Sequence, residues 1–83
     1  MAARSITSEG ARKMESGKIR NAIRRLRFEH GEMTQGELAK KIGVTRQTVN
    51  AVEQAKYSPS LEAAFRIAAV FGLPLEQVFQ YEN

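Results

Sequence analysis

The segment from Thr34 to Lys56 constrains this chain more than any other, because its pattern is that of two short helices joined by a tight turn. Thr34 and Glu37 have the spacing of a capping box, so the first of these helices is predicted to begin at Thr34. Apolar side chains then recur at helical spacing, at Leu38, Ala39 and Ile42. Gly43 follows them, and glycine adopts the left-handed conformation that ends many helices at little cost. Thr45 is the next N-cap, so the two helices are expected to cross sharply.

The second helix of this segment has an unusual outer face. Helical spacing buries Val49 and Val52, and the opposite face is polar, uncharged or small, at Gln47, Asn50, Ala51 and Gln54. Solvated helix faces normally carry Glu and Lys instead. Glutamine and asparagine place a donor beside an acceptor, which suits bidentate contact with adenine in the DNA major groove, and Arg46 is suited to guanine. The face therefore favours base reading over the alternative of a surface without a partner.

This segment resembles the helix-turn-helix of the phage-repressor family, also called Cro/C1 or XRE. It matches T-Q-x-E-L-A, the turn G-V-T and the run R-Q-T-V-x-x-x-E, and the likeness extends from about residue 19 to residue 80. The resemblance implies an all-α fold, a compact five-helix bundle of the lambda-repressor-like DNA-binding type with the helix-turn-helix at helices 2 and 3. It also implies an ion pair between Arg27 and Glu53, and a homodimer joined at the C-terminal end.

Two positions depart from the family pattern. Gly36 lies in the first turn of the first motif helix, where glycine costs roughly 0.5–1 kcal/mol relative to alanine. After Glu53 the family usually has Asn-Gly or Lys-Gly, whereas this chain has Gln54 and Ala55. Either Ala55 is strained in a left-handed conformation or the helix ends in another way.

The remaining segments are divided into an extension and three further helices. Residues 1–18 are predicted to be a flexible N-terminal extension, either an arm that follows phosphates or a dispensable tail, and residues 19–83 the helix-turn-helix domain. A first helix is predicted from Lys18 to His30, where Gly31 ends it. Ser60 is the N-cap of a fourth helix and Pro74 opens a short fifth one.

The candidate site residues have three roles. Base edges are expected to be read by Thr45, Arg46, Gln47, Asn50 and Ala51. Phosphates are expected to be contacted by Gln35, Thr48, Gln54 and Lys56. The apolar residues expected at the dimer interface are Val70, Leu75, Val78, Phe79 and Tyr81.

Composition excludes several classes of protein. The 83 residues include no cysteine and one histidine, so disulfides and thiolate metal sites are excluded, and no metal or cofactor is expected. The chain has neither a phosphate-binding loop nor a plausible pair of nucleophile and base, which argues against an enzyme. It has no apolar run long enough to span a membrane, so a cytoplasmic protein is expected.

Charge and motif together indicate a function. Residues 19–56 carry eight basic and four acidic side chains, so the positive charge accompanies the proposed reading unit. We therefore expect a sequence-specific regulator that binds double-stranded DNA, a repressor acting as a homodimer on a palindromic operator. Two alternatives remain, an antitoxin that also covers a toxin and an adaptor that uses the same fold to bind proteins.

Overall fold

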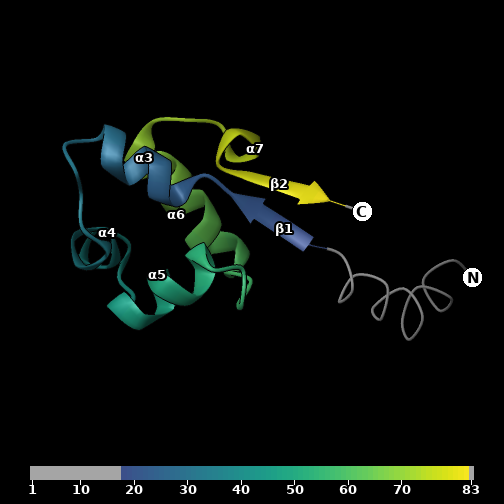
Figure 1. Ribbon diagram of the computed structural model, residues 1–83, viewed down its shortest axis with the longest axis horizontal. Helices are drawn as coiled ribbons and strands as arrows, with labels where there is room; N and C mark the ends of the chain where they lie inside the picture. Colours follow the sequence, from purple (N-terminus) through teal and green to yellow (C-terminus); the bar gives the residue numbers. More distant parts are fainter. Residues whose placement is uncertain (1–17, 83) are drawn as a thin grey trace, which may run out of the picture.

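The computed structural model describes residues 18–82, which form five helices and a two-stranded sheet (Figure 1). The elements are β1 (Lys18–Asn21), α3 (Ile23–Glu29), α4 (Gln35–Ile42), α5 (Arg46–Glu53), α6 (Leu61–Phe71), α7 (Leu75–Val78) and β2 (Phe79–Glu82). None of the helices in this part of the chain is long and apolar enough to cross a membrane. The predicted extension, residues 1–18, lies outside the described residues except for Lys18.

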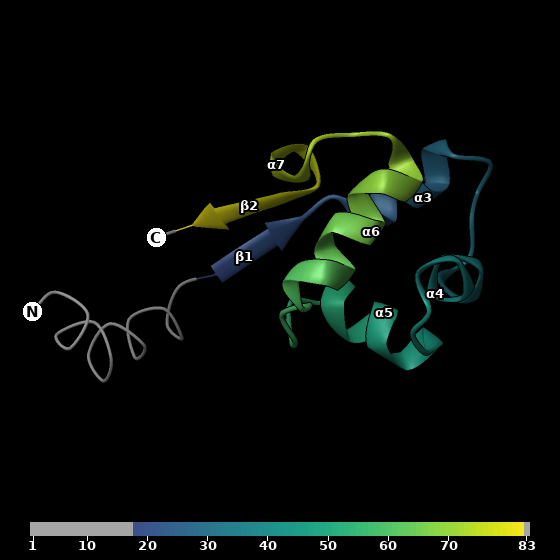
Figure 2. The ribbon, with the colours of Figure 1, turned by 180° about the vertical axis from the view of Figure 1, so that it is seen from behind.

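The small sheet corrects the prediction of an all-α fold. β1 and β2 pair antiparallel, with Ile19 opposite Tyr81 and Asn21 opposite Phe79. The first helix therefore begins at Ile23, and not at Lys18 as the apolar spacing suggested. The prediction failed because the backbone groups of β1 find their partners some sixty residues away along the chain, on β2, which local periodicity does not reveal. Figure 2 shows the two strands extending together away from the helices.

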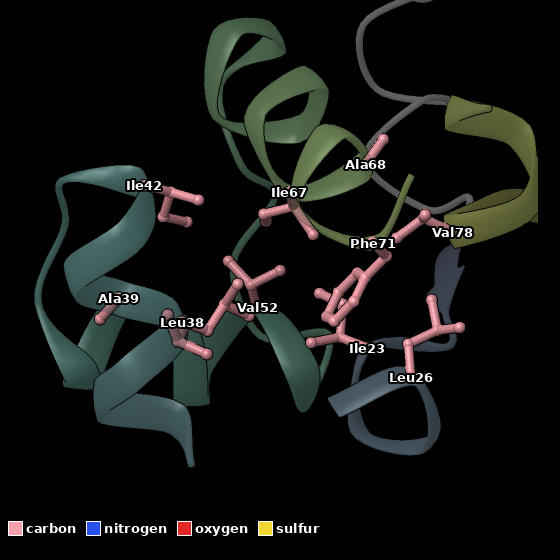
Figure 3. Packing of buried hydrophobic residues seen from close by; sticks show 11 residues of the cluster. Ile23, Leu26, Leu38, Ala39, Ile42, Val52, Ile67, Ala68, Phe71 and Val78 are labelled. Carbon is pink, nitrogen blue, oxygen red and sulfur yellow. The ribbon is translucent and has the colours of Figure 1, made fainter. Parts of the chain in front are cut away.

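The core is built from all five helices. The largest fully buried side chains are Ile23, Leu38, Val49, Ile67 and Val78, one from each helix. Figure 3 shows side chains from these helices between the ribbons, with Val52 and Ile67 in the middle and Phe71 close to Ile23. Because each helix contributes an apolar face to the same cluster, the position of α5 is fixed by its buried side rather than by its outer one.

Burial also corrects one expected dimer contact. Val78 is 0 % exposed within a single chain, so its side chain is not available to a second copy. Three others, Val70, Leu75 and Phe79, are partly buried against the core of their own chain. Tyr81 is the member of the set that is largely accessible, with 55 % of its surface exposed. The apolar positions near the C-terminus thus serve mainly to complete the core.

The helix boundaries follow from their caps. Thr34 and Glu37 form the complete capping box at the start of α4, and Thr45 accepts a hydrogen bond from the backbone of Thr48 at the start of α5. Gly43 ends α4 with a φ of 80°. After α5 the same left-handed conformation falls on Ala55, with a φ of 60°, so the strained alternative is the one that the structure adopts.

Replacing Ala55 with glycine should therefore stabilise the protein. A side chain in the left-handed region costs roughly 1–2 kcal/mol, and glycine's extra freedom in the unfolded chain offsets part of the gain, so we expect a rise of about 1 kcal/mol in the free energy of unfolding. Urea unfolding measures it. Ala69→Gly on the exposed side of α6 is the matched control and should lower the same quantity by about 0.5–1 kcal/mol. Equal losses in both variants would contradict the strain at Ala55.

Candidate nucleic-acid interface

The outer face of α5 is accessible, as the sequence predicted. Arg46, Gln47 and Asn50 are exposed, and Ala51 is half-buried on the same helix. The opposite face, with Val49 and Val52, is buried in the core. The structure therefore presents three of the five expected base-reading side chains on one helix, in an open position.

The first turn of α5 holds the two threonines of the site. The Thr45 hydroxyl accepts a hydrogen bond from the Thr48 backbone at 3.1 Å and lies 3.0 Å from the Thr48 hydroxyl. Thr45 is exposed and Thr48 is half-buried. The Thr45 hydroxyl thus caps the helix, and the Thr48 hydroxyl is paired with it.

Arg27 and Glu53 form the ion pair that the family resemblance implied. Arg27 Nη2 lies 3.1 Å from Glu53 Oε1 and its Nε lies 2.5 Å from Oε2, so the guanidinium holds both carboxylate oxygens. Arg27 Nη1 also donates to the backbone oxygen of Met33 at 2.7 Å. The two side chains are only 14 % and 7 % exposed. This pair ties α3 to the last turn of α5 and to the loop that leads into α4.

A chain of amide side chains continues from this carboxylate. Gln35 Nε2 donates to Glu53 Oε1 at 3.2 Å and to Asn50 Oδ1 at 3.1 Å. Gln54 Nε2 donates to the same Asn50 oxygen at 3.3 Å. An ionised carboxylate only accepts, so Glu53 fixes which end of the Gln35 amide faces it, and Gln35 in turn fixes the oxygen of Asn50.

The hydrogen-bond network leaves two predicted site residues, Asn50 and Gln35, with fewer free donors and acceptors than their residue types have. The oxygen of Asn50 already accepts two hydrogen bonds, so its free hydrogen-bonding groups are the donors on Nδ2. Both amide hydrogens of Gln35 are engaged, so its side chain positions Asn50 and has no donor left for the phosphate contact that the sequence predicted. The other expected phosphate residues, Gln54 and Lys56, are exposed.

Asn21 is a structural residue of the site that sequence reasoning missed. Its Nδ2 donates to the backbone oxygens of Val52 and Glu53 at 3.0 and 3.4 Å, at the end of α5. Its Oδ1 accepts from the backbone of Ile23 at 3.2 Å. An asparagine two residues before a helix signals a local cap, but its second role joins parts of the chain that are far apart in sequence.

Arg24 is a second residue that the sequence analysis did not single out. With the ion pair and the amide network it lines a hollow of about 350 Å³ beside the last turns of α5. The residues around this hollow are Arg24, Arg27, Gln35, Asn50, Glu53 and Gln54. The helical spacing of α3 could have placed Arg24 about one turn before Arg27, but it could not show that Arg24 lines the same hollow as Gln54.

Comparison with known proteins now identifies the family. A helix-turn-helix family model matches residues 23–78, which run from the first residue of α3 to the last residue of α7. The chain belongs to the Cro/C1 (XRE) helix-turn-helix family. The resemblance drawn from its sequence is confirmed.

Relatives of this helix-turn-helix protein occur in archaea and bacteria. An uncharacterized HTH-type transcriptional regulator of Methanocaldococcus jannaschii is 48 % identical over 65 residues, covering 78 % of this chain and 97 % of the relative. YgzD of Bacillus subtilis, also described as an uncharacterized HTH-type transcriptional regulator, is 41 % identical with the same coverage. A crystal structure of a candidate DNA-binding protein from Bacteroides fragilis superimposes with a TM-score of 0.64, over 75 % of this chain and 98 % of that one. At 21 % identity, this last likeness shows the fold alone.

Breaking the Arg27–Glu53 ion pair of this helix-turn-helix protein should strongly lower its free energy of unfolding. Arg27→Leu leaves the Glu53 carboxylate nearly buried without its cation, so the free energy of unfolding should fall by about 3–5 kcal/mol. Adding Glu53→Leu should recover part of that loss, which a double-mutant cycle in urea measures.

The control for this prediction lies on the same helix. Arg25 and Glu29 form an ion pair at 3.5 Å whose side chains are 64 % and 51 % exposed. Arg25→Leu should therefore change stability by less than about 0.5 kcal/mol. Similar losses for Arg25→Leu and Arg27→Leu would contradict a special role for the buried pair.

Proposed function

We propose that this protein is a sequence-specific regulator of transcription that binds double-stranded DNA, a cytoplasmic repressor that acts as a homodimer on a palindromic operator. The observation that carries the proposal is the exposed amide face of α5, oriented by a nearly buried carboxylate. Relatives named as HTH-type transcriptional regulators support it. A repressor of this kind acts by occupying DNA that the transcription machinery needs, so it requires binding and no chemistry.

The geometry assigns each motif helix a place on DNA. α4 would lie across the backbone, with the unpaired amides of its first turn at a phosphate. α5 would enter the major groove, where Arg46 and Gln47 are free to form bidentate contacts. Thr45 and Ala51 would touch thymine methyl groups, while Thr48, Gln54 and Lys56 would contact phosphates.

Asn50 would read a different base from the one its residue type suggests. Bidentate contact with adenine needs an oxygen that accepts from the base, and the oxygen of Asn50 already accepts from Gln35 and Gln54. Its two remaining donors match an edge that offers only acceptors, such as O6 and N7 of guanine. We therefore expect Asn50 to favour guanine, and Gln47 to remain the residue suited to adenine.

A homodimer would place two such units on one face of DNA. Two copies related by a two-fold axis read half-sites about one helical turn apart, roughly 34 Å, which makes the operator palindromic. Tyr81 is the exposed member of the proposed interface, whereas Val70, Leu75 and Phe79 are partly buried against the core of their own chain. Two linked half-sites would supply the affinity that a single short helix lacks.

Selection of bound sequences from random DNA tests the proposal directly. The wild-type protein should enrich a palindrome, and Gln47→Ala should lose the base preference at one position in each half-site, a change of about 1–3 kcal/mol in discrimination. Gln80→Ala, an exposed glutamine on β2, is the control and should select the wild-type sequence. The absence of any enriched sequence would exclude the proposed function, and a uniform loss of affinity in Gln47→Ala would exclude base reading by that side chain.

The same selection tests the orientation of Asn50. Gln35→Leu removes one of the two donors to Asn50 Oδ1, so the preferred base at that position should move from guanine toward adenine. The readout is the ratio of guanine to adenine at the position read by Asn50. A general loss of phosphate binding would leave this ratio unchanged. An identical base ratio in wild type and Gln35→Leu would contradict the control of Asn50 by Gln35.

A further inference from the structure

We propose that Arg24 of α3 binds a backbone phosphate of the DNA, which extends the interface beyond the two motif helices. The inference rests on the proposed function, because it assumes that α5 lies in the major groove. It adds a residue from the helix before the motif, a position to which neither the sequence nor the family match assigned a contact.

The position of Arg24 is the first observation. Arg24 lines the hollow of about 350 Å³ together with Asn50 and Gln54. It also lines a larger hollow of about 800 Å³ along α3, where its neighbours include Arg25 and Phe28. Its side chain therefore lies on the border between the amide network of the reading helix and the open, basic side of α3.

The charge of the smaller hollow is the second observation. Arg27 and Glu53 neutralise each other there at hydrogen-bonding distance. Within residues 18–82 the other ion pairs are Arg20 with Glu82, Arg25 with Glu29 and Arg66 with Glu62. Arg24 is exposed and takes part in none of these pairs. Its guanidinium thus leaves the hollow with one uncompensated positive charge.

The groups around this charge are suited to an anionic oxygen. Gln54 lines the same hollow and keeps one amide hydrogen beyond the one given to Asn50. A guanidinium beside a neutral donor matches the geometry of a phosphate, which the guanidinium binds through two parallel hydrogen bonds. The hollow borders the exposed side of α5, so a strand that flanks the major groove would supply that phosphate.

Salt dependence of DNA binding tests the role of Arg24. Each phosphate contact contributes about 0.9 to the slope of log K against log salt concentration, so Arg24→Ala should reduce the slope by about that amount. Its affinity should fall by the same factor for the selected operator and for an unrelated duplex, because a phosphate carries no sequence. Arg24→Lys keeps the charge and should retain most of the slope.

Arg25→Ala is the matched control. Arg25 is the next residue on α3, it is already paired with Glu29, and it does not line the hollow beside α5. Its slope should equal that of the wild type. An unchanged slope in Arg24→Ala, or a loss confined to one base position of the operator, would overturn the inference while leaving the proposed function intact. Absence of DNA binding by the wild type would instead remove the proposed function itself.

Discussion

The packing of α3, α4 and α5 depends on two charged side chains, Arg27 and Glu53, that are almost fully buried. Transferring Arg27 and Glu53 to an interior where they are 14 % and 7 % exposed costs several kcal/mol for each ion, and only close, multiple contacts offset such a cost. The pair obtains them from three directions, because the guanidinium also holds the oxygen of Met33 and the carboxylate also accepts from Gln35. α3, α4 and α5 must therefore meet in one geometry for these charges to be satisfied.

That geometry extends to the surface. The Glu53 carboxylate sets the orientation of the Gln35 amide, which in turn sets that of Asn50. The orientation of the exposed Asn50 side chain thus depends on the nearly buried Glu53. Asn21 secures the end of the same helix by bonding to its last carbonyl groups. A side chain held in place before binding loses less conformational freedom when it meets its partner. Arg46 and Gln47, which are exposed in the first turn of α5, would complement it in the proposed complex with side chains that are free to adapt to a base.

Sequence patterns correctly predicted the features that depend on residues close together in the chain, namely helix caps and the buried face of a helix. The capping box at Thr34, the left-handed glycine at Gly43 and the buried valines of α5 all lie where spacing placed them. The sheet escaped prediction, because β1 is paired only through contacts with the far end of the chain. Val78 was assigned to a dimer interface for a similar reason, since the sequence does not show whether an apolar side chain is covered by its own chain or by a second copy. The donors of Asn50 and the position of Arg24 depend on neighbours from other helices, which no single stretch of sequence contains.

The amide face of α5 is proposed to contact base pairs directly. Side-chain amide resonances report it best, measured by NMR on nitrogen-15-labelled protein during titration with a selected duplex and with a duplex altered at a single base pair. We predict that the Gln47 and Asn50 amide signals shift on binding and differ between the two duplexes, while those of Gln77 and Gln80 near the C-terminus remain in place. Shifts confined to Gln77 and Gln80, with Gln47 and Asn50 unchanged, would contradict it.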